Sequence, residues 1–591
     1  MKKVLKWTIV LSIFFLNSAY AQIVGGEALL SDGIFSLKPF GFDDADGIVK
    51  KVAVSGQSFN QALEINTFNN SKIGMGLNAK INTNFKKGDV LLISFKTKNI
   101  ESKRETGESF IEVRFDQLKN HNYVWPSHLE RGVSFGKEWT ETNIPFIMEK
   151  DAKAEDVLFV MKFDSYPEKF QISQLKFINY GPNVSLNNLP RSVIKYDGDE
   201  VDAKWRKDAD ERIDKYRKGD LAITVLDNNG KLVSGAEVEV KMKRIAYNWG
   251  TATNSKTLLD TVNRNSKIYR DTLLKYFNQV VFENEMKGPN WVSNNHEQTK
   301  EGLLWLKKHQ IPVRGHVMVW PSWEHSAHLK AFKNDTAGLK RSIFNLIDDE
   351  TAEMKNQFAE WDVVNEPYAH HDFLNLLGRY EMVEWFKRAA KGNTGAKLFL
   401  NDYTMFHGKG PNSASEKFYD NVKYLLANHA PIDAVGEQGH IGGTPPGIPE
   451  VIERLEYFSQ LGLPIQISEF DINSNDDEFK AKYMGDFMKA VFSQPLTIGF
   501  VQWGFWEGMH WFPVAALWDK DWNLRANGKV FTQLVNKTWN TNVSGTTDKA
   551  GVFKTRGFNG SYDITVKYNG KEVTNKAVLT SKDLSVNVAI P

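Results

Sequence analysis

Hydrophobic and polar positions between about residues 244 and 540 alternate between short apolar segments and amphipathic stretches. Stretches with helical periodicity, such as 296–309 and 477–493, separate the apolar segments, and the spacing is that of repeated strand–helix units. Eight such units predict an α/β fold, a (β/α)8 TIM barrel. A doubly wound open sheet is the alternative, but the glycine-rich phosphate loop usual in that fold is not found here. The apolar segments are residues 247–250, 279–282, 313–319, 360–364, 397–400, 434–438, 465–468 and 498–502.

Both flanks of this region have the alternation of β-strands. Residues 23–185 contain short apolar runs separated by polar turns, which predicts a β-sandwich. Residues 221–243 alternate around Asp227-Asn228-Asn229-Gly230, a hairpin signal, and residues after about 541 are similar, with a turn at Asn569-Gly570. These two pieces are compatible with one small sandwich or with separate units.

A charged segment precedes the predicted hairpin. Residues 197–218 are dense in charges of both signs and have few apolar positions, which suggests a solvated helical linker. We therefore predict these domains: 23–185, N-terminal sandwich; 186–243, linker and hairpin; 244–540, barrel; 541–591, small C-terminal β-rich domain.

The first residues have the layout of a signal peptide. Lys2, Lys3 and Lys6 precede an apolar run over 4–16, and Ala19-Tyr20-Ala21 supplies the small residues of a cleavage site. The run is too short to span a bilayer comfortably, and no second stretch of spanning length follows. We expect cleavage near Ala21 and a secreted or periplasmic protein with no membrane association afterwards.

Composition narrows the function further. Lys plus Arg number 74 and Asp plus Glu 72, for a net charge of +2, which argues against nucleic-acid or membrane-surface binding. The chain has no cysteine, so disulfides, thiolate metal sites and cysteine nucleophiles are excluded. With 591 residues, several domains are expected.

Two predicted strands end in glutamate-containing motifs. Glu366 follows the fourth apolar segment and Glu469 follows the seventh. Active residues of barrels cluster at the C-terminal ends of strands, so both carboxylates are expected at the barrel mouth. A single glutamate there would be interpreted as a surface ion pair, whereas a pair is the equipment for glycoside hydrolysis.

Over about 245–530 the sequence resembles glycoside hydrolase family 10, the retaining endo-β-1,4-xylanases. The resemblance rests on residues 361–367 and 467–471, with further motifs at 282–287, 314–320 and 438–440. It implies that Glu366 is the general acid/base and Glu469 the nucleophile. It also implies these substrate-binding residues: Asn284, Lys287, His316, Trp320, Asn365, Gln438, His440, Trp503 and Trp511.

A retaining mechanism assigns the two carboxylates different protonation states. A hydrogen bond from His440 is expected to keep Glu469 ionised, because such bonds lower a carboxyl pKa. Apolar walls and the neighbouring charge are expected to raise the pKa of Glu366, so that it donates a proton. Asn365 is expected to bond the sugar 2-hydroxyl.

Two positions depart from the family pattern. Pro321 replaces a second histidine, and Gly288 stands where an aromatic residue is common. The substrate is thus predicted to be xylan or a related β-glycan, and a catalytically silent polysaccharide-binding protein is the alternative of another class. We expect a monomer with no cofactor and no metal, and we interpret His370-His371-Asp372 as a solvated loop.

The N-terminal sandwich has its own resemblance. Residues 170–180 are similar to the closing strands of galactose-binding-like carbohydrate-binding modules, and Tyr123, Trp125 and Trp139 are candidate stacking residues. A purely structural appendage is the alternative, since aromatics are common in sandwich cores.

Overall fold

The computed structural model describes two compact units. Of the described residues, those within 25–100, 110–131 and 137–192 form one unit, and the remaining ones to Pro591 form the other. None of the described helices is long and apolar enough to cross a membrane. The predicted signal peptide lies outside the described residues. These are 25–591 apart from 42–45, 69–74, 104–106, 120–121, 164–166, 294–295, 393–394, 409 and 581–582, with the side chains of 122–126 and 155 also excluded.

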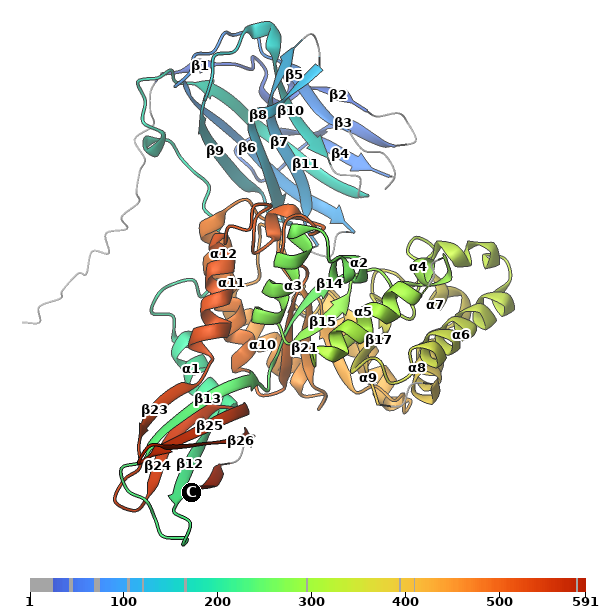
Figure 1. The fold of residues 1–591 in the computed structure, drawn as a ribbon. Coiled ribbons are helices and arrows are strands. Elements are labelled where there is room, and N and C mark those ends of the chain that lie inside the picture. Colours follow the sequence, from blue (N-terminus) through green and yellow to red (C-terminus); the bar gives the residue numbers. More distant parts are fainter. Residues whose placement is uncertain are drawn as a thin grey trace, which may run out of the picture. The chain divides into compact units, whose positions relative to one another are not determined.

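The first unit is the predicted β-sandwich (Figure 1). Its strands alternate buried and half-exposed positions, as in β7, where Ile111, Val113 and Phe115 face the core. The first sheet has the order β3 (Gly47–Ala53), β4 (Gln61–Thr67), β11 (Glu168–Asn179), β6 (Val90–Ser102) and β9 (Thr140–Ile147), with β1 (Glu27–Ala28) beside β11. The second has the order β2 (Lys38–Phe40), β5 (Gly76–Lys80), β10 (Val157–Phe163), β7 (Ser109–Lys119) and β8 (Asn122–Phe135).

The second unit contains the predicted (β/α)8 barrel. Eight parallel strands of the described chain close into a ring, because the last pairs with the first and β19 pairs directly with β21. Closure excludes the open-sheet alternative. The strands are β14 (Asn248–Thr253), β15 (Gln279–Phe282), β16 (Val313–Gly315), β17 (Glu360–Asn365), β18 (Lys397–Asp402), β19 (Ala434–Glu437), β21 (Ile465–Ile472) and β22 (Thr497–Gln502), with the short β20 (His440–Ile441) beside β21.

Amphipathic helices surround these strands, and several begin at side-chain caps. Asp335, Ser413 and Asp476 each accept a hydrogen bond from the backbone N–H three residues on, which fixes where α6, α9 and α11 start. The helices are α2 (Ser255–Leu259), α3 (Arg264–Tyr276), α4 (Gly288–Ser293), α5 (Glu297–Lys308), α6 (Thr336–Glu353), α7 (Asp372–Leu377), α8 (Glu381–Gly392), α9 (Ala414–Ala427), α10 (Ile448–Ser459), α11 (Asp477–Ser493) and α12 (Ala526–Gln533).

A small sandwich combines segments from both sides of the barrel sequence. Figure 1 shows β12 (Lys218–Leu226) and β13 (Glu237–Ile245) among the C-terminal strands. One sheet has the order β24 (Val552–Phe558), β12, β27 (Leu584–Ala589), and the other β23 (Asn542–Thr546), β13, β25 (Gly560–Tyr568), β26 (Lys571–Leu579). The structure thus joins the two β-rich pieces around one core.

The hairpin predicted over 221–243 forms only next to its turn, where the Asp227 N–H donates to the Lys231 carbonyl and the Val233 N–H to the Val225 carbonyl, both at 2.9 Å. The Gly230 N–H donates to the Asp227 carbonyl at 3.0 Å, but β12 and β13 enter different sheets. Each strand has one apolar face, and the two faces pack against each other in the shared core instead of pairing edge to edge. The other predicted turn is confirmed, since Asn569 and Gly570 connect β25 to β26 with φ values of 48° and 78°.

The charged segment forms helix α1 (Lys204–Arg217), but it is not a solvated linker. Trp205, Ala209 and Ile213, spaced four apart, are buried in the barrel unit's main core. Asp486 on α11 forms an ion pair with Arg206 and accepts a hydrogen bond from the Tyr196 hydroxyl at 2.7 Å. Because three apolar positions are enough for one helix face, a mostly charged segment packs as part of the unit.

Candidate active site

Glu366 and Glu469 are both buried. Glu366 directly follows β17 and is 2% exposed, while Glu469 lies in β21 and is 5% exposed. Glu366 has a φ of +54°, which is uncommon for a residue other than glycine. Its N–H donates to the Asn401 carbonyl at 2.8 Å, so the neighbouring strand helps to hold this backbone conformation.

A chain of two amides connects the two carboxylates. The Asn365 side chain donates to Glu366 Oε1 at 3.0 Å, and the Asn401 Nδ2 donates both to Asn365 Oδ1 at 2.8 Å and to Glu469 Oε1 at 2.6 Å. Ser468 Oγ donates to Asn401 Oδ1 at 2.6 Å, which fixes the orientation of that amide. The two glutamates therefore belong to one fully buried hydrogen-bond network.

The sequence predicted Asn365 as a site residue but not Asn401. Asn401 stands about one third of the way along the chain from the first glutamate motif to the second, near the end of β18, where a polar residue after the apolar run Leu398–Leu400 was the available signal. Gln438, also predicted, donates from Nε2 to Glu366 Oε1 at 2.7 Å.

Glu469 is held in its ionised form. Burial acts to raise its pKa, but the nearby charges of His316 and His440 outweigh burial and lower the pKa to about 2. His316 Nδ1 lies 3.9 Å from Glu469 Oε1, and His440 Nε2 lies 3.7 Å from Oε2. His440 therefore lies beside Glu469, at a distance longer than the hydrogen bond that was predicted.

Asp471 and Trp511 hold His440 in position. Its Nδ1 lies 2.9 Å from Asp471 Oδ1, and Trp511 Nε1 donates to Asp471 Oδ2 at 2.6 Å. Burial acts to lower the pKa of His440, but Asp471 and Glu469 together raise it well above its ordinary value. A cationic His440 thus faces Glu469, and the predicted Trp511 reaches it through Asp471.

A second buried network orients His316. Its Nδ1 lies 2.9 Å from Asp362 Oδ2, and Asp362 forms an ion pair with Arg314. Arg314, 1% exposed, also contacts Glu360 at 3.2 Å and donates to Gln466 at 2.6 Å. In the sequence these charged residues interrupt otherwise apolar segments. In the structure they pair with one another, which offsets the cost of burying their charges.

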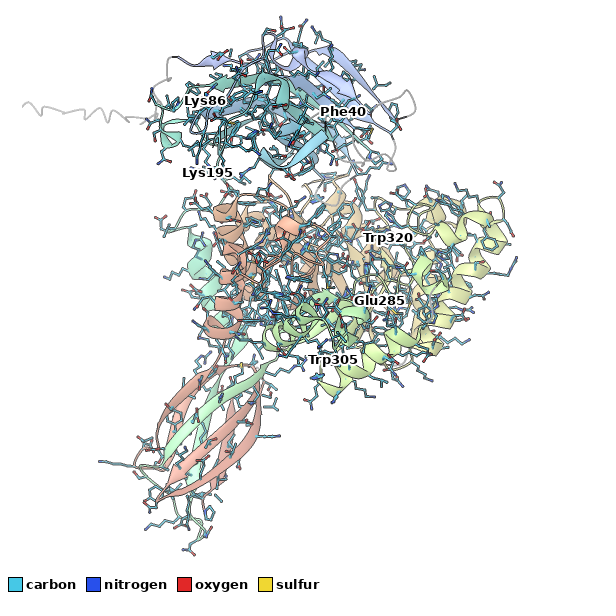
Figure 2. The ribbon with its side chains drawn as sticks, turned by 45° about the horizontal axis from the view of Figure 1, so that its top comes forward. Phe40, Lys86, Lys195, Glu285, Trp305 and Trp320 are labelled. Atoms are coloured by element: carbon cyan, nitrogen blue, oxygen red, sulfur yellow. The ribbon has the colours of Figure 1, made fainter. Side chains whose placement is uncertain are left out.

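The predicted aromatic and polar walls join the same network. The Trp503 ring meets the His316 ring edge-on, with ring centroids 5.4 Å apart. The centroid of the Trp320 ring lies 6.3 Å from that of His316. Lys287 Nζ lies 5.5 Å from the Trp320 centroid and 3.1 Å from Asn284 Oδ1 (Trp320 is labelled in Figure 2). The structure thus links all the predicted site residues through a continuous series of contacts.

The departure at Gly288 has a steric cause. A Cβ at position 288 would lie 2.6 Å from His328 Cε1, so the His328 ring takes the space that a side chain would need. An aromatic residue at 288 therefore cannot fit without moving His328.

The interpretation of His370-His371-Asp372 as a solvated loop is wrong for two of the three residues. His371 is exposed, but the His370 side chain is 14% exposed and its Nε2 lies 3.4 Å from Glu366 Oε2. Asp372 accepts a hydrogen bond from the Trp323 N–H at 3.0 Å. Sequence spacing gave no sign of this, because the loop returns to the site only in three dimensions.

Comparison with known proteins gives a consistent family. Residues 239–533 match the family described as Glycosyl hydrolase family 10. The chain is 30% identical over 395 residues to Anti-sigma-I factor RsgI6 of Acetivibrio thermocellus, covering 62% of this chain and 47% of that protein. It is 30% identical over 357 residues to Endo-1,4-beta-xylanase 1 of Arabidopsis thaliana, covering 60% and 37%. The chain thus spans less than half the length of these relatives.

Among solved structures, the chain is similar to xylanase 10B from Thermotoga petrophila RKU-1 in complex with xylobiose. The two are 21% identical with a TM-score of 0.45, and the similarity covers 50% of this chain and 95% of that one.

Proposed function

Because residues 239–533 belong to glycosyl hydrolase family 10, we propose that the chain is an exported endo-β-1,4-xylanase that cleaves internal bonds of xylan with retention of configuration. The observation that carries the proposal is the buried network joining Glu366 to Glu469 through Asn365 and Asn401. Two linked carboxylates, one of them kept ionised, are what double displacement requires.

Glu469 is the nucleophile in this proposal. With its pKa at about 2, it is anionic throughout the neutral range and attacks the anomeric carbon to form a glycosyl ester. Its two oxygens are fixed by Asn401 and His440, so little reorganisation is needed when the ester forms.

Glu366 is the general acid and then the general base. Both amide donations, from Asn365 and Gln438, go to its Oε1, so the proton that passes to the leaving oxygen is carried on Oε2. After departure of the leaving group, the same oxygen takes a proton from the water that hydrolyses the ester. Asn365, beside Glu366, is the proposed partner of the sugar 2-hydroxyl.

Product chromatography tests the proposal. The purified chain is incubated with glucuronoxylan and, in parallel, with β-glucan and mannan. Short xylo-oligosaccharides from xylan alone support it, and cleavage of another glycan alone would replace xylan by that substrate. Activity on none of the three would contradict the xylanase proposal and favour the polysaccharide-binding protein. Unchanged turnover in Glu469→Ala would refute Glu469 as the nucleophile.

We further propose that the N-terminal sandwich binds polysaccharide. The supporting observation is a half-buried polar row on β7 and β8, in which Arg114 Nε and Ser127 Oγ donate to Asp116 Oδ1 at 3.0 and 2.6 Å. Trp139 instead packs edge-on against Phe59, with centroids 4.9 Å apart, and the side chains of Tyr123 and Trp125 lie outside the described residues. Retention of the Glu469→Ala chain on insoluble xylan, lost in Arg114→Ala, would support binding, and unchanged retention would contradict it.

A further inference from the structure

A histidine–carboxylate cluster lies beside the proposed acid/base. Glu324, His325 and His370 each offer one ligand atom, and these atoms all lie within 4.8 Å of one another. Among the residues that the structure describes, this is the one such group of three or more histidines and carboxylates. The hydrolysis derived above uses none of them. Since the loops after β16 and β17 supply the ligands, no local spacing in the sequence revealed the cluster.

Packing holds the two imidazoles in place. The His325 ring stacks on Trp320 with centroids 3.8 Å apart and an interplanar angle of 12°. The His370 ring meets the His325 ring edge-on, with centroids 4.5 Å apart. The backbone N–H of His370 donates to the Glu366 carbonyl at 2.9 Å. The rings are therefore positioned by neighbouring groups, and an ion would need to order only the exposed Glu324.

The donor set indicates the kind of ion. Burial lowers the pKa of His325 to about 3 and that of His370 to about 4, so both rings are neutral and their lone pairs are available near pH 7. Two imidazoles and a carboxylate are ligands of Zn²⁺ and its late first-row neighbours, whereas Ca²⁺ and Mg²⁺ prefer oxygen alone. Three protein ligands leave one tetrahedral position for water.

We propose that Glu324, His325 and His370 bind a divalent cation of the Zn²⁺ type, and that the bound ion inhibits hydrolysis. The inhibition rests on the proposed function, while the binding does not. His370 Nε2 lies 3.4 Å from Glu366 Oε2, so an ion on this ring brings a double positive charge close to that carboxyl group. The ion attracts Oε2, the oxygen that faces the leaving group in the proposed mechanism, and holds it away from the leaving oxygen.

Calorimetric titration of the full chain with zinc chloride at pH 7.5 tests the binding. We expect saturable binding of one ion, with affinity reduced at least about tenfold in His325→Gln and in His370→Gln. Glu324→Gln alters an exposed side chain, so it leaves the fold intact and is expected to weaken binding severalfold. His371→Gln is the matched control, because this exposed neighbour is not in the cluster and should bind as the wild type does. No saturable binding, or equal affinity in the wild type and the three cluster variants, would overturn the site.

Xylan hydrolysis with and without zinc tests the inhibition. We expect zinc to inhibit the wild type, EDTA to restore activity, and His325→Gln to need at least about tenfold more zinc for the same fractional loss of its own metal-free rate. Zinc binding that leaves the rate unchanged would overturn the inhibitory effect. A chain that binds zinc but cleaves no glycan would keep the site and refute the proposed function, whereas a chain that cleaves xylan but binds no zinc would do the reverse.

Discussion

Asn401 offers the sharpest test of the network between the two glutamates. Asn401→Ala removes the amide that donates to Glu469 Oε1 at 2.6 Å and to Asn365 Oδ1 at 2.8 Å. A hydrogen bond to a charged group contributes about 1.5–3 kcal/mol. At 1.36 kcal/mol per factor of ten, the loss predicts a fall in kcat/KM of roughly 10- to 150-fold. Initial rates on xylan measure this fall. Asn428→Ala, just after the end of α9 and outside the network, should keep the wild-type rate.

Asn401→Asp extends the test to pH. A carboxylate in place of the amide puts a like charge beside Glu469, which raises the pKa of that group. Activity requires ionised Glu469 and is lost as the pH falls through its pKa, which lies at about 2 in the wild type. The acidic limb of kcat/KM should therefore move upward into the measurable range above pH 3 in the variant. A variant with the wild-type rate and an unshifted limb would refute the coupling between Asn401 and Glu469.

Four further outcomes follow from individual contacts. Glu366→Gln should lose xylan hydrolysis yet still cleave the first bond of an aryl xylobioside with a good leaving group, which needs no acid; equal loss on both substrates would contradict the acid role. Trp205→Ala should cost about 3–5 kcal/mol in urea unfolding, because α1 is packed, and no change would restore the linker interpretation. Gly288→Phe should lower the melting temperature, with recovery in the double variant with His328→Ala, and a stable single variant would contradict the steric argument. Burial raises the pKa of Glu350 well above 4.5, and neither of its oxygens has a hydrogen-bond partner among the described residues. The wild type should therefore lose stability relative to Glu350→Gln as the pH rises above 4.5; a constant difference in melting temperature would contradict this.

Local patterns predicted the barrel because most of the strand segments contain a short run of apolar residues. In β15, for example, Gln279 is followed by three apolar residues and all four positions are buried, as expected of a parallel strand that is covered on both faces. The error at β12 and β13 has the opposite origin, since alternation identifies a strand but does not distinguish edge pairing from face packing. Most residues of α1 are charged, so the three apolar positions of its buried face were too few to predict from the sequence that the helix packs against the barrel.

The site divides in the same way. Glu366 and Glu469 stand within extended sequence motifs, so the sequence alone was enough to propose them. Asn401 and the pair of His325 and His370 acquire their roles from strand neighbours and returning loops, which no short spacing encodes. Buried ion pairs such as Arg314 with Asp362 were visible only as charges in apolar runs.

In the sequence, the barrel is inserted between two parts of the small sandwich. Lys218 pairs with Phe558, so the whole barrel must be synthesised before the strands that pair with β12 exist. At about 5–20 residues per second, three hundred residues take roughly 15–60 seconds, during which the edges of β12 and β13 are unpaired. In a protein truncated near residue 540, β12 and β13 would stay unpaired. The truncation removes the partner strands of both and leaves their apolar faces uncovered. The strands after residue 540 are therefore needed for β12 and β13 to fold, and a shortened protein should keep both segments or lack both.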